Sequence, residues 1–280
     1  MKFALFGINT GPCADPAVIK SVSVAAEKAG FESLWTGEHV VLPDPQEPPS
    51  PAPPLTPLLH PSTALANIAA ITDSIGLGTG ITLLAQRNAL VLAKEMASLD
   101  VLSGGRLILG LGAGYLKAEF DALGVNFEER GARTDEYMDV MREIWSSDNP
   151  SFNGRFVSFS GIQSRPKPAR AGGPPYVMGG TSPAAFRRAV ARCQGWYGFA
   201  MDHDTTASCL EGLKRAGEKF DRPDSLAELE ISVTPRAPLT GEDLKRYEEL
   251  GVDRLILLQS GRNQEDLLAF VDQISGEFIQ

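Results

Sequence analysis

The 280-residue sequence contains only three cysteines and three histidines, and this scarcity excludes several kinds of site. Cys13, Cys193 and Cys209 form no C-x-x-C pair, so the sequence predicts neither a disulfide framework nor a thiolate zinc site. The motifs G-x-S-x-G and H-E-x-x-H, typical of serine hydrolases and zinc proteases, do not occur. We therefore expect no metal site, and cysteines without a pairing pattern favour a reducing cytoplasm.

Positive charge and long apolar runs are also scarce. The chain has 26 Lys and Arg against 35 Asp and Glu, whereas nucleic-acid-binding domains normally carry a basic patch. No stretch approaches the ~20 consecutive apolar residues of a membrane span. The N-terminal MKFALFGINTG has an apolar run too short for a secretion signal and is typical of a first strand. The sequence therefore predicts a cytoplasmic protein that binds a small-molecule substrate, and neither nucleic acid nor a membrane.

Strand-like and helix-like segments alternate along the chain, which predicts an α/β fold. A Pro- and Gly-rich stretch at 148–175 interrupts the order between the fourth and fifth units, and its alternating residues 152–159 predict a small inserted hairpin. Eight strand–helix units in one chain favour a single-domain (β/α)₈ TIM barrel over residues 1–280, not an open sheet. The predicted strands are 3–8, 33–36, 75–84, 106–111, 176–178, 196–199, 229–233 and 254–258, and the predicted helices are 16–29, 62–72, 88–102, 134–145, 183–192, 205–220, 241–250 and 264–274.

The chemistry of such barrels lies at the C-terminal ends of the strands, because the βα loops gather there. The second predicted strand ends in Thr36-Gly37-Glu38-His39. An imidazole titrates near pH ~6.5 and a neighbouring carboxylate can orient it, so this pair indicates a proton-transfer site. The alternative is a structural histidine that bonds a loop carbonyl. The loop that follows, 43–61, carries nine of the 20 prolines and is either a semi-rigid lid or a plain surface loop.

Glycines mark three further strand ends. The third strand contains Gly78-Thr79-Gly80-Ile81-Thr82 and the fourth ends in Gly110-Leu111-Gly112-Ala113-Gly114, and neither fits the dinucleotide motif G-x-G-x-x-G. Glycine inside a strand indicates a bulge or the close approach of a ligand, or it relieves crowding inside a narrow barrel. The fifth strand ends in Gly179-Gly180-Thr181-Ser182-Pro183, where Ser182 and Pro183 favour a helix start. A helix N-terminus of this kind can bind a phosphate.

Four blocks of sequence, in this order, resemble the luciferase-like oxidoreductases, barrel enzymes that use FMN or the deazaflavin coenzyme F420. The most specific block runs from Ile75 to Gly124, and the others begin at Glu129 (ERGARTDEYMDVMREIW), Arg165 (RPKP) and Gly179 (GGTSPAAFRRA). The resemblance covers nearly the whole chain. The residues in these blocks are most similar to those of the deazaflavin-dependent branch. The resemblance implies a homodimer.

The resemblance also implies roles for residues at the strand ends. Glu38 and His39 match an acid–histidine pair beside the reactive face of the cofactor, in which the imidazole exchanges a proton and Glu38 or a nearby backbone group orients it. Gly80 and Ile81 match a bulge, often a non-proline cis peptide, that backs the cofactor ring. The other implied cofactor contacts are Thr36 at the end of the second strand, the loop Gly112, Ala113 and Gly114 near the cofactor tail, and Gly179, Gly180 and Thr181 around its phosphate.

One position departs from the family pattern. Some deazaflavin dehydrogenases of this family carry a catalytic acid directly after the strand-four glycines, where this chain has Tyr115. We therefore do not expect oxidation of a sugar phosphate, and Glu119 lies too far along the chain to take the place of that acid. The predicted function is F420-dependent hydride transfer between the deazaflavin C5 and a small organic substrate. The alternatives are an FMN-dependent luciferase-like monooxygenase and a non-catalytic flavin-binding barrel.

Overall fold

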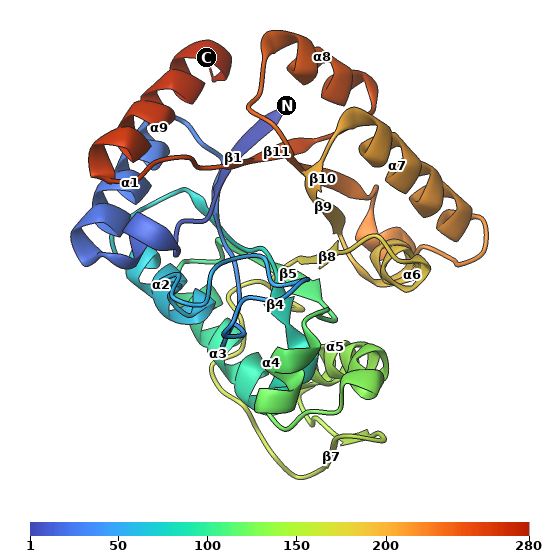
Figure 1. Ribbon diagram of the computed structural model, residues 1–280. Helices are drawn as coiled ribbons and strands as arrows, with labels where there is room; N and C mark the ends of the chain where they lie inside the picture. Colours follow the sequence, from blue (N-terminus) through green and yellow to red (C-terminus); the bar gives the residue numbers. More distant parts are fainter. Residues whose placement is uncertain (280) are drawn as a thin grey trace.

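The computed structural model describes residues 1–279 and shows a closed barrel of parallel strands with helices around it (Figure 1). Strand β1 (Lys2–Phe6) pairs with β2 (Ser33–Thr36) on one side and with β11 (Arg254–Leu258) on the other, which closes the barrel. The remaining barrel strands follow in chain order: β3 (Gly76–Thr79), β4 (Thr82–Leu83), β5 (Leu107–Gly112), β8 (Tyr176–Gly179), β9 (Gly195–Met201) and β10 (Glu230–Pro235). The predicted (β/α)₈ TIM barrel is confirmed, with β3 and β4 as two parts of its third strand.

Helices connect successive strands on the outside of the barrel. The eight principal ones are α1 (Pro16–Lys28), α2 (Pro61–Ala69), α3 (Ala89–Leu102), α5 (Arg130–Ser146), α6 (Pro183–Arg192), α7 (His203–Gly217), α8 (Gly241–Glu249) and α9 (Gln264–Phe278). A short helix that the sequence did not predict, α4 (Lys117–Ala122), precedes α5. The insertion contains the predicted hairpin as two antiparallel strands, β6 (Phe152–Asn153) and β7 (Ser158–Phe159). Short 3₁₀ segments lie at Gly11–Ala14, Leu84–Gln86, Phe127–Glu129 and Asp224–Leu226.

Local capping chemistry sets many of these boundaries. The carboxylate of Asp15 accepts hydrogen bonds from the first-turn N–H groups of α1, and the amide oxygen of Asn88 does the same for α3. Helix α1 is followed by Gly30 in the left-handed region (φ +85°), where glycine is favoured. Among residues 1–279, no helix combines the length and the apolar character that a membrane span requires.

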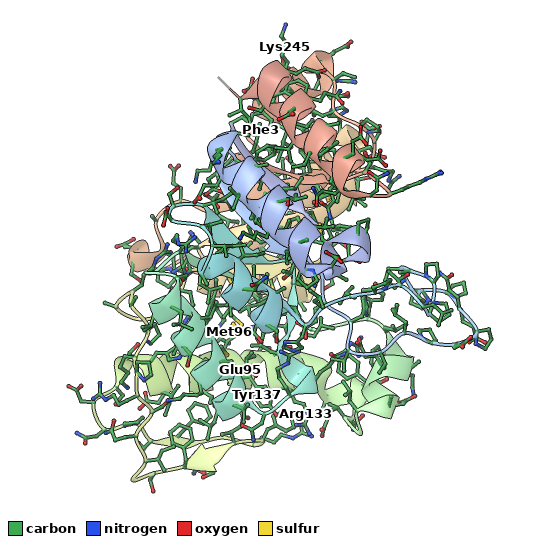
Figure 2. All side chains as sticks on the ribbon, turned by 90° about the vertical axis from the view of Figure 1, so that its left-hand side faces the viewer. Phe3, Glu95, Met96, Arg133, Tyr137 and Lys245 are labelled. Carbon is green, nitrogen blue, oxygen red and sulfur yellow. The ribbon has the colours of Figure 1, made fainter. Side chains whose placement is uncertain are left out.

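Two apolar layers hold the barrel together. The inner layer consists of side chains that point into the barrel: Ala4, Phe6, Trp35, Ile108, Val177, Tyr197 and Ile256. The outer layer fills the space between strands and helices and includes Met96 of α3 and Tyr137 of α5, which Figure 2 shows on neighbouring helices beside Arg133. Arg133 donates to the Tyr137 hydroxyl at 3.0 Å. The outer layer thus packs α5 against α3.

The third strand departs from its predicted form. A single strand was expected over 75–84, but β3 ends at Thr79, a cis peptide joins Gly80 to Ile81, and β4 begins at Thr82. The Gly80 N–H donates to the Thr36 carbonyl at 2.7 Å, so the chain remains attached to β2 where the regular pattern stops. The bulge with a cis bond that the family resemblance implied at Gly80–Ile81 is confirmed. The first strand also stops earlier than predicted, because Gly7 turns the chain with φ +86°.

Candidate active site

His39 and Glu119 face each other at the C-terminal end of the barrel. His39 lies in the loop after β2 and Glu119 on α4, which follows β5, and His39 Nδ1 is 3.3 Å from Glu119 Oε2. The Glu119 side chain is fully buried, and His39 keeps a small contact with solvent. The Glu119 carboxylate also accepts from the Gln86 side chain at 2.9 Å and from the backbone N–H of Val40. One buried carboxylate therefore joins the loops that follow three different strands.

The segment before His39 is fixed as well. The side chain of Asn9 accepts from the Gly37 N–H at 2.9 Å and donates to the Gly37 carbonyl at 2.9 Å. The same amide nitrogen donates to the Leu59 carbonyl. Asn9 thus connects the loop after β1 to both ends of the proline-rich segment. The backbone that carries His39 is held from two sides, by Asn9 and by Glu119.

The environment of Glu119 keeps this carboxyl group ionised. Burial by itself raises the pKa of Glu119, but the contacts with His39, Gln86 and the Val40 N–H outweigh burial and hold the pKa below its usual value. An ionised carboxylate beside Nδ1 favours a proton on that ring nitrogen. The lone pair of a neutral His39 ring is then on Nε2, for which the structure describes no hydrogen bond to the protein. This arrangement allows His39 to accept or return a proton at Nε2.

Glu38 does not take the role that the sequence suggested. Its buried carboxylate is hydrogen-bonded by the Arg87 guanidinium and accepts from the Leu83 N–H at 3.3 Å. Arg87 also lies 3.3 Å from His60 Nε2. The two neighbouring side chains meet different partners, since Glu38 contacts Arg87 while His39 lies beside Glu119. The predicted contact of Glu38 with His39 is therefore absent among residues 1–279, and the acid that lies beside the His39 ring is Glu119. Orientation of His39 by a nearby backbone group, the other possibility, stays a prediction.

Glu119 is a site residue that the sequence did not predict. It lies on α4, four residues beyond Tyr115, and the structure places its carboxylate beside His39. The signal was present in the sequence, because Glu119 follows a strand end and so obeys the rule that selected His39. Sequence separation was the wrong criterion, since a loop followed by a helical turn can reverse the chain.

Tyr115 packs against His39. The two rings meet edge to face with centroids 6.0 Å apart, and about half of the tyrosine surface is exposed. Burial and the negative charge of Glu119 raise the pKa of the Tyr115 hydroxyl. The hydroxyl therefore stays protonated at neutral pH and can donate a hydrogen bond. A tyrosine thus occupies the position at which the family pattern placed an acid.

Several strand-end glycines serve the packing of Ile81. A Cβ added at Gly112 would lie 1.9 Å from Ile81 Cδ1, and one at Gly179 would lie 2.9 Å from Ile81 Cγ2. A Cβ at Gly110 would lie 1.8 Å from the Thr79 carbonyl oxygen. These glycines leave room for the chain around the cis peptide, which agrees with the alternative that they relieve crowding inside the barrel. The predicted contacts of Gly80, Ile81, Gly112 and Gly179 with a cofactor stay predictions.

The start of α6 has the form predicted for a phosphate site. Ser182 caps the helix by accepting from the Ala185 N–H at 3.2 Å, and Pro183 occupies its first position. The backbone from Gly180 to Ala184 is exposed, and Gly180 has φ +110°. Arg187 points elsewhere, because its guanidinium bonds Asp135 of α5. The Gly180 N–H donates to the Tyr197 carbonyl at 3.4 Å, so any anion at this helix start would be held by the backbone N–H groups from Thr181 onward.

The remaining predicted cofactor contacts are Ala113, Gly114 and Thr36. Ala113 and Gly114 leave β5 toward α4, and a Cβ at Gly114, which has φ +84°, would lie 2.7 Å from the Phe120 ring. Thr36 is fully buried, and its hydroxyl has no hydrogen-bond partner among residues 1–279. Strand alternation puts Thr36 on the same side as Leu34, which belongs to the outer layer. Contact of these residues with a cofactor stays a prediction.

Residues 3–265 match the family described as luciferase-like monooxygenase. This chain belongs to the luciferase-like monooxygenase family. An uncharacterised protein of Mycobacterium tuberculosis is 27% identical over 262 residues, which cover 90% of each protein. An FMNH₂-dependent dimethylsulfone monooxygenase of Pseudomonas fluorescens is 36% identical over 125 residues, which cover 44% of this chain and 32% of that protein.

A solved structure shares the whole luciferase-like barrel. An F420-dependent secondary alcohol dehydrogenase, in complex with an F420–acetone adduct, superposes with a TM-score of 0.80 at 16% identity. The superposition covers 100% of this chain and 99% of the other. At this identity the likeness shows the fold alone. Of these similar proteins, one depends on F420 and one on reduced FMN. Membership of the family therefore does not identify the cofactor of this chain.

Proposed function

We propose that this chain is an oxidoreductase that uses coenzyme F420 to transfer a hydride to or from a small organic substrate. The observation that carries the proposal is the His39–Glu119 pair, with a buried carboxylate at Nδ1 and a free Nε2 at the barrel mouth. When an alcohol loses a hydride from carbon, its hydroxyl must also lose a proton, and an oriented imidazole accepts that proton. The barrel shared with an F420-dependent secondary alcohol dehydrogenase supports the same chemistry.

The residues present fit a cofactor that has a flat ring and an anionic tail. The exposed backbone at Thr181 and the start of α6 suits a phosphate. When bound, the deazaflavin would supply the hydride acceptor or donor at its C5 carbon. The backbone N–H groups at Thr181 would hold its tail, and the Gly80–Ile81 segment would lie behind its ring.

The side chains at the mouth would handle the proton. His39 Nε2 takes the substrate hydroxyl proton during oxidation and returns it during reduction. The positive charge that forms on the imidazole is balanced by the buried Glu119 carboxylate. Tyr115, whose ring packs against His39, can donate a hydrogen bond to the substrate oxygen. General-base catalysis of this kind typically contributes about 10²–10⁴-fold in rate.

The competing proposal is an FMN-dependent monooxygenase, favoured by the 36% identical stretch shared with a dimethylsulfone monooxygenase. A titration of the purified protein with F420 and with FMN, followed by fluorescence quenching, separates the two. We expect tighter binding of F420, followed by substrate-dependent reduction of the bound deazaflavin. Tighter binding of FMN, with O₂ consumption by its reduced form, would establish the monooxygenase. Absence of binding to both would refute any flavin-type cofactor.

A further inference from the structure

Three apolar side chains line one half of the barrel mouth, and we call them the apolar shelf: Phe6, Phe199 and Leu258. Each follows an inward-pointing residue by two positions, after Ala4, Tyr197 and Ile256 respectively, so each points toward the barrel axis. The Phe6 and Phe199 rings lie 5.1 Å apart, and Leu258 is the register partner of Phe6 between β1 and β11. Phe6 is buried, but Phe199 is 49% and Leu258 is 51% exposed.

The apolar shelf is continuous with the segment that carries His39. A Cβ added at Gly37 would lie 3.4 Å from the Phe6 ring, and one at Gly80 would lie 2.9 Å from it. Gly37 is two residues before His39. A molecule that rests on Phe199 can therefore extend across Phe6 toward the imidazole.

The backbone beside the apolar shelf is unusual. Ala200, directly after Phe199, has φ +54°, a conformation that non-glycine residues rarely adopt. Arg236 bonds the Ala200 carbonyl at 3.1 Å and holds this turn in place. Strained positions of this kind cluster at ligand sites, where they fix the direction of a neighbouring side chain. Ala200 lies within β9, which continues to Met201 with a shift in its register against β10, and Phe199 is half exposed at this irregularity.

The apolar shelf and the glycine-rich strand ends belong to different strands of the barrel, and they meet where Phe6 packs against Gly80. The glycine-rich ends belong to β3, β5 and β8, whereas the shelf belongs to β9, β11 and β1. The proposed phosphate site at α6 follows β8 and so lies on the glycine side. If the cofactor binds on the glycine side, the apolar shelf is available to the substrate, and its side chains would contact an apolar part of that substrate.

We infer that the apolar shelf binds the non-reacting part of the substrate, and that the substrate is an alcohol, or the matching carbonyl compound, with an aryl or branched alkyl group. This inference rests on the proposed function. In the oxidation, the deazaflavin would accept the hydride that the carbinol carbon loses, His39 would accept the hydroxyl proton, and the C–O single bond would become a carbonyl. The apolar group stays on Phe199 and Leu258 in both directions.

The test uses acetophenone and its alcohol, phenyl methyl carbinol, as probes, with acetone and propan-2-ol as their small counterparts. The variants are Phe199→Ala and Leu258→Ala, with Phe220→Ala and Leu102→Ala as matched controls that are exposed just beyond α7 and on α3. Calorimetry measures the Kd of acetophenone, with and without F420, and steady-state kinetics measures KM for both alcohols. Circular dichroism checks the folding of each variant.

We expect Phe199→Ala to weaken acetophenone binding by about tenfold or more, since a buried phenyl contact has at least this value. The Michaelis constant for the aryl alcohol should rise by a similar factor. For propan-2-ol the Michaelis constant should change by less than about twofold, as should the Kd of F420, and the control variants should match the wild type. Leu258→Ala should act in the same direction with a smaller effect.

Two results would overturn the inference: unchanged acetophenone binding in both shelf variants, or a comparable loss of F420 affinity, which would assign the shelf to the cofactor. Failure of the proposed function gives a different pattern. Acetophenone binding would then depend on Phe199, while neither alcohol reduced F420, and the shelf would stand as a site for apolar aryl compounds.

Discussion

His39 Nδ1 lies 3.3 Å from a carboxylate oxygen of Glu119, although the two residues belong to loops after different strands. The acid that precedes His39 in the sequence is bound to Arg87 instead. The site therefore contains two separate buried acids with separate partners. Glu119 is suited to orient a base, and Glu38 is suited to anchor a loop. The predictions below separate these functions.

Replacement of His39 by Ala should lower kcat by about 10²–10⁴-fold, because the proton acceptor is lost. Cofactor affinity should change little, since the proposed phosphate site at α6 is untouched. Steady-state kinetics and a cofactor titration measure the two quantities. His203→Ala is the control, because His203 contacts Asp243 and Tyr247 of α8 and not Glu119. Near-normal turnover by a folded His39→Ala protein would show that the histidine is structural.

Glu119→Gln keeps the shape of the side chain but removes its charge, so kcat should fall, though less than in His39→Ala. The variant should also change the dependence of stability on pH. The folded-state pKa of Glu119 lies below its usual value of 4.5, so its ionised form stabilises the fold at neutral pH. This contribution is lost as the pH falls below 4.5 and through the folded-state pKa.

Thermal unfolding of wild type and Glu119→Gln at neutral pH and in acid, about one pH unit below the usual glutamate pKa, tests this assignment. The wild type should have the higher Tm at neutral pH, and the difference between the two proteins should shrink in acid. Other ionised carboxylates, such as Asp135, contribute equally to both proteins and cancel in the comparison. A Tm difference that stays constant, or grows in acid, would contradict an ionised Glu119.

Glu38→Gln should destabilise the fold by about 3 kcal/mol, because it leaves the Arg87 charge without its partner. The effect lies at the lower end of the range for buried pairs, since Arg87 keeps some contact with solvent. Addition of Arg87→Met should recover part of the loss. Urea unfolding of Glu38→Gln, Arg87→Met and the double variant, each compared with wild type, completes a double-mutant cycle. The kcat of the folded Glu38→Gln protein should stay within about tenfold of wild type. A loss of kcat as large as that of His39→Ala would show that Glu38 takes part in catalysis.

Gly112→Ala should destabilise the protein by about 1–3 kcal/mol, because its new Cβ collides with Ile81 Cδ1. Ile81→Val removes that carbon atom and by itself should cost about 0.5–1.5 kcal/mol. The double variant should be more stable than the sum of the two single effects implies, as measured by chemical denaturation. Strict additivity would show that Gly112 is required for another reason, such as the approach of a ligand.

The sequence by itself determined the repeating order of strands and helices. Helix α6 and strand β11 have the predicted bounds, 183–192 and 254–258, because their signals are local. Ser182 and Pro183 mark the start of α6, and the apolar run from Leu255 marks a buried strand. The strand-end rule also pointed to His39 before any contact was known. Each of these inferences depends on residues within a few positions of one another.

Only the tertiary structure decided which acid meets His39 and where the third strand breaks. Glu38 is adjacent to His39 in the sequence, but its carboxylate binds Arg87, and α4 brings Glu119 to His39 from a different strand end. The break after Thr79 depends likewise on space left by Gly112 and Gly179, on strands that follow later in the chain. Contacts of this kind arise when the barrel closes, because closure brings the ends of all its strands to one rim.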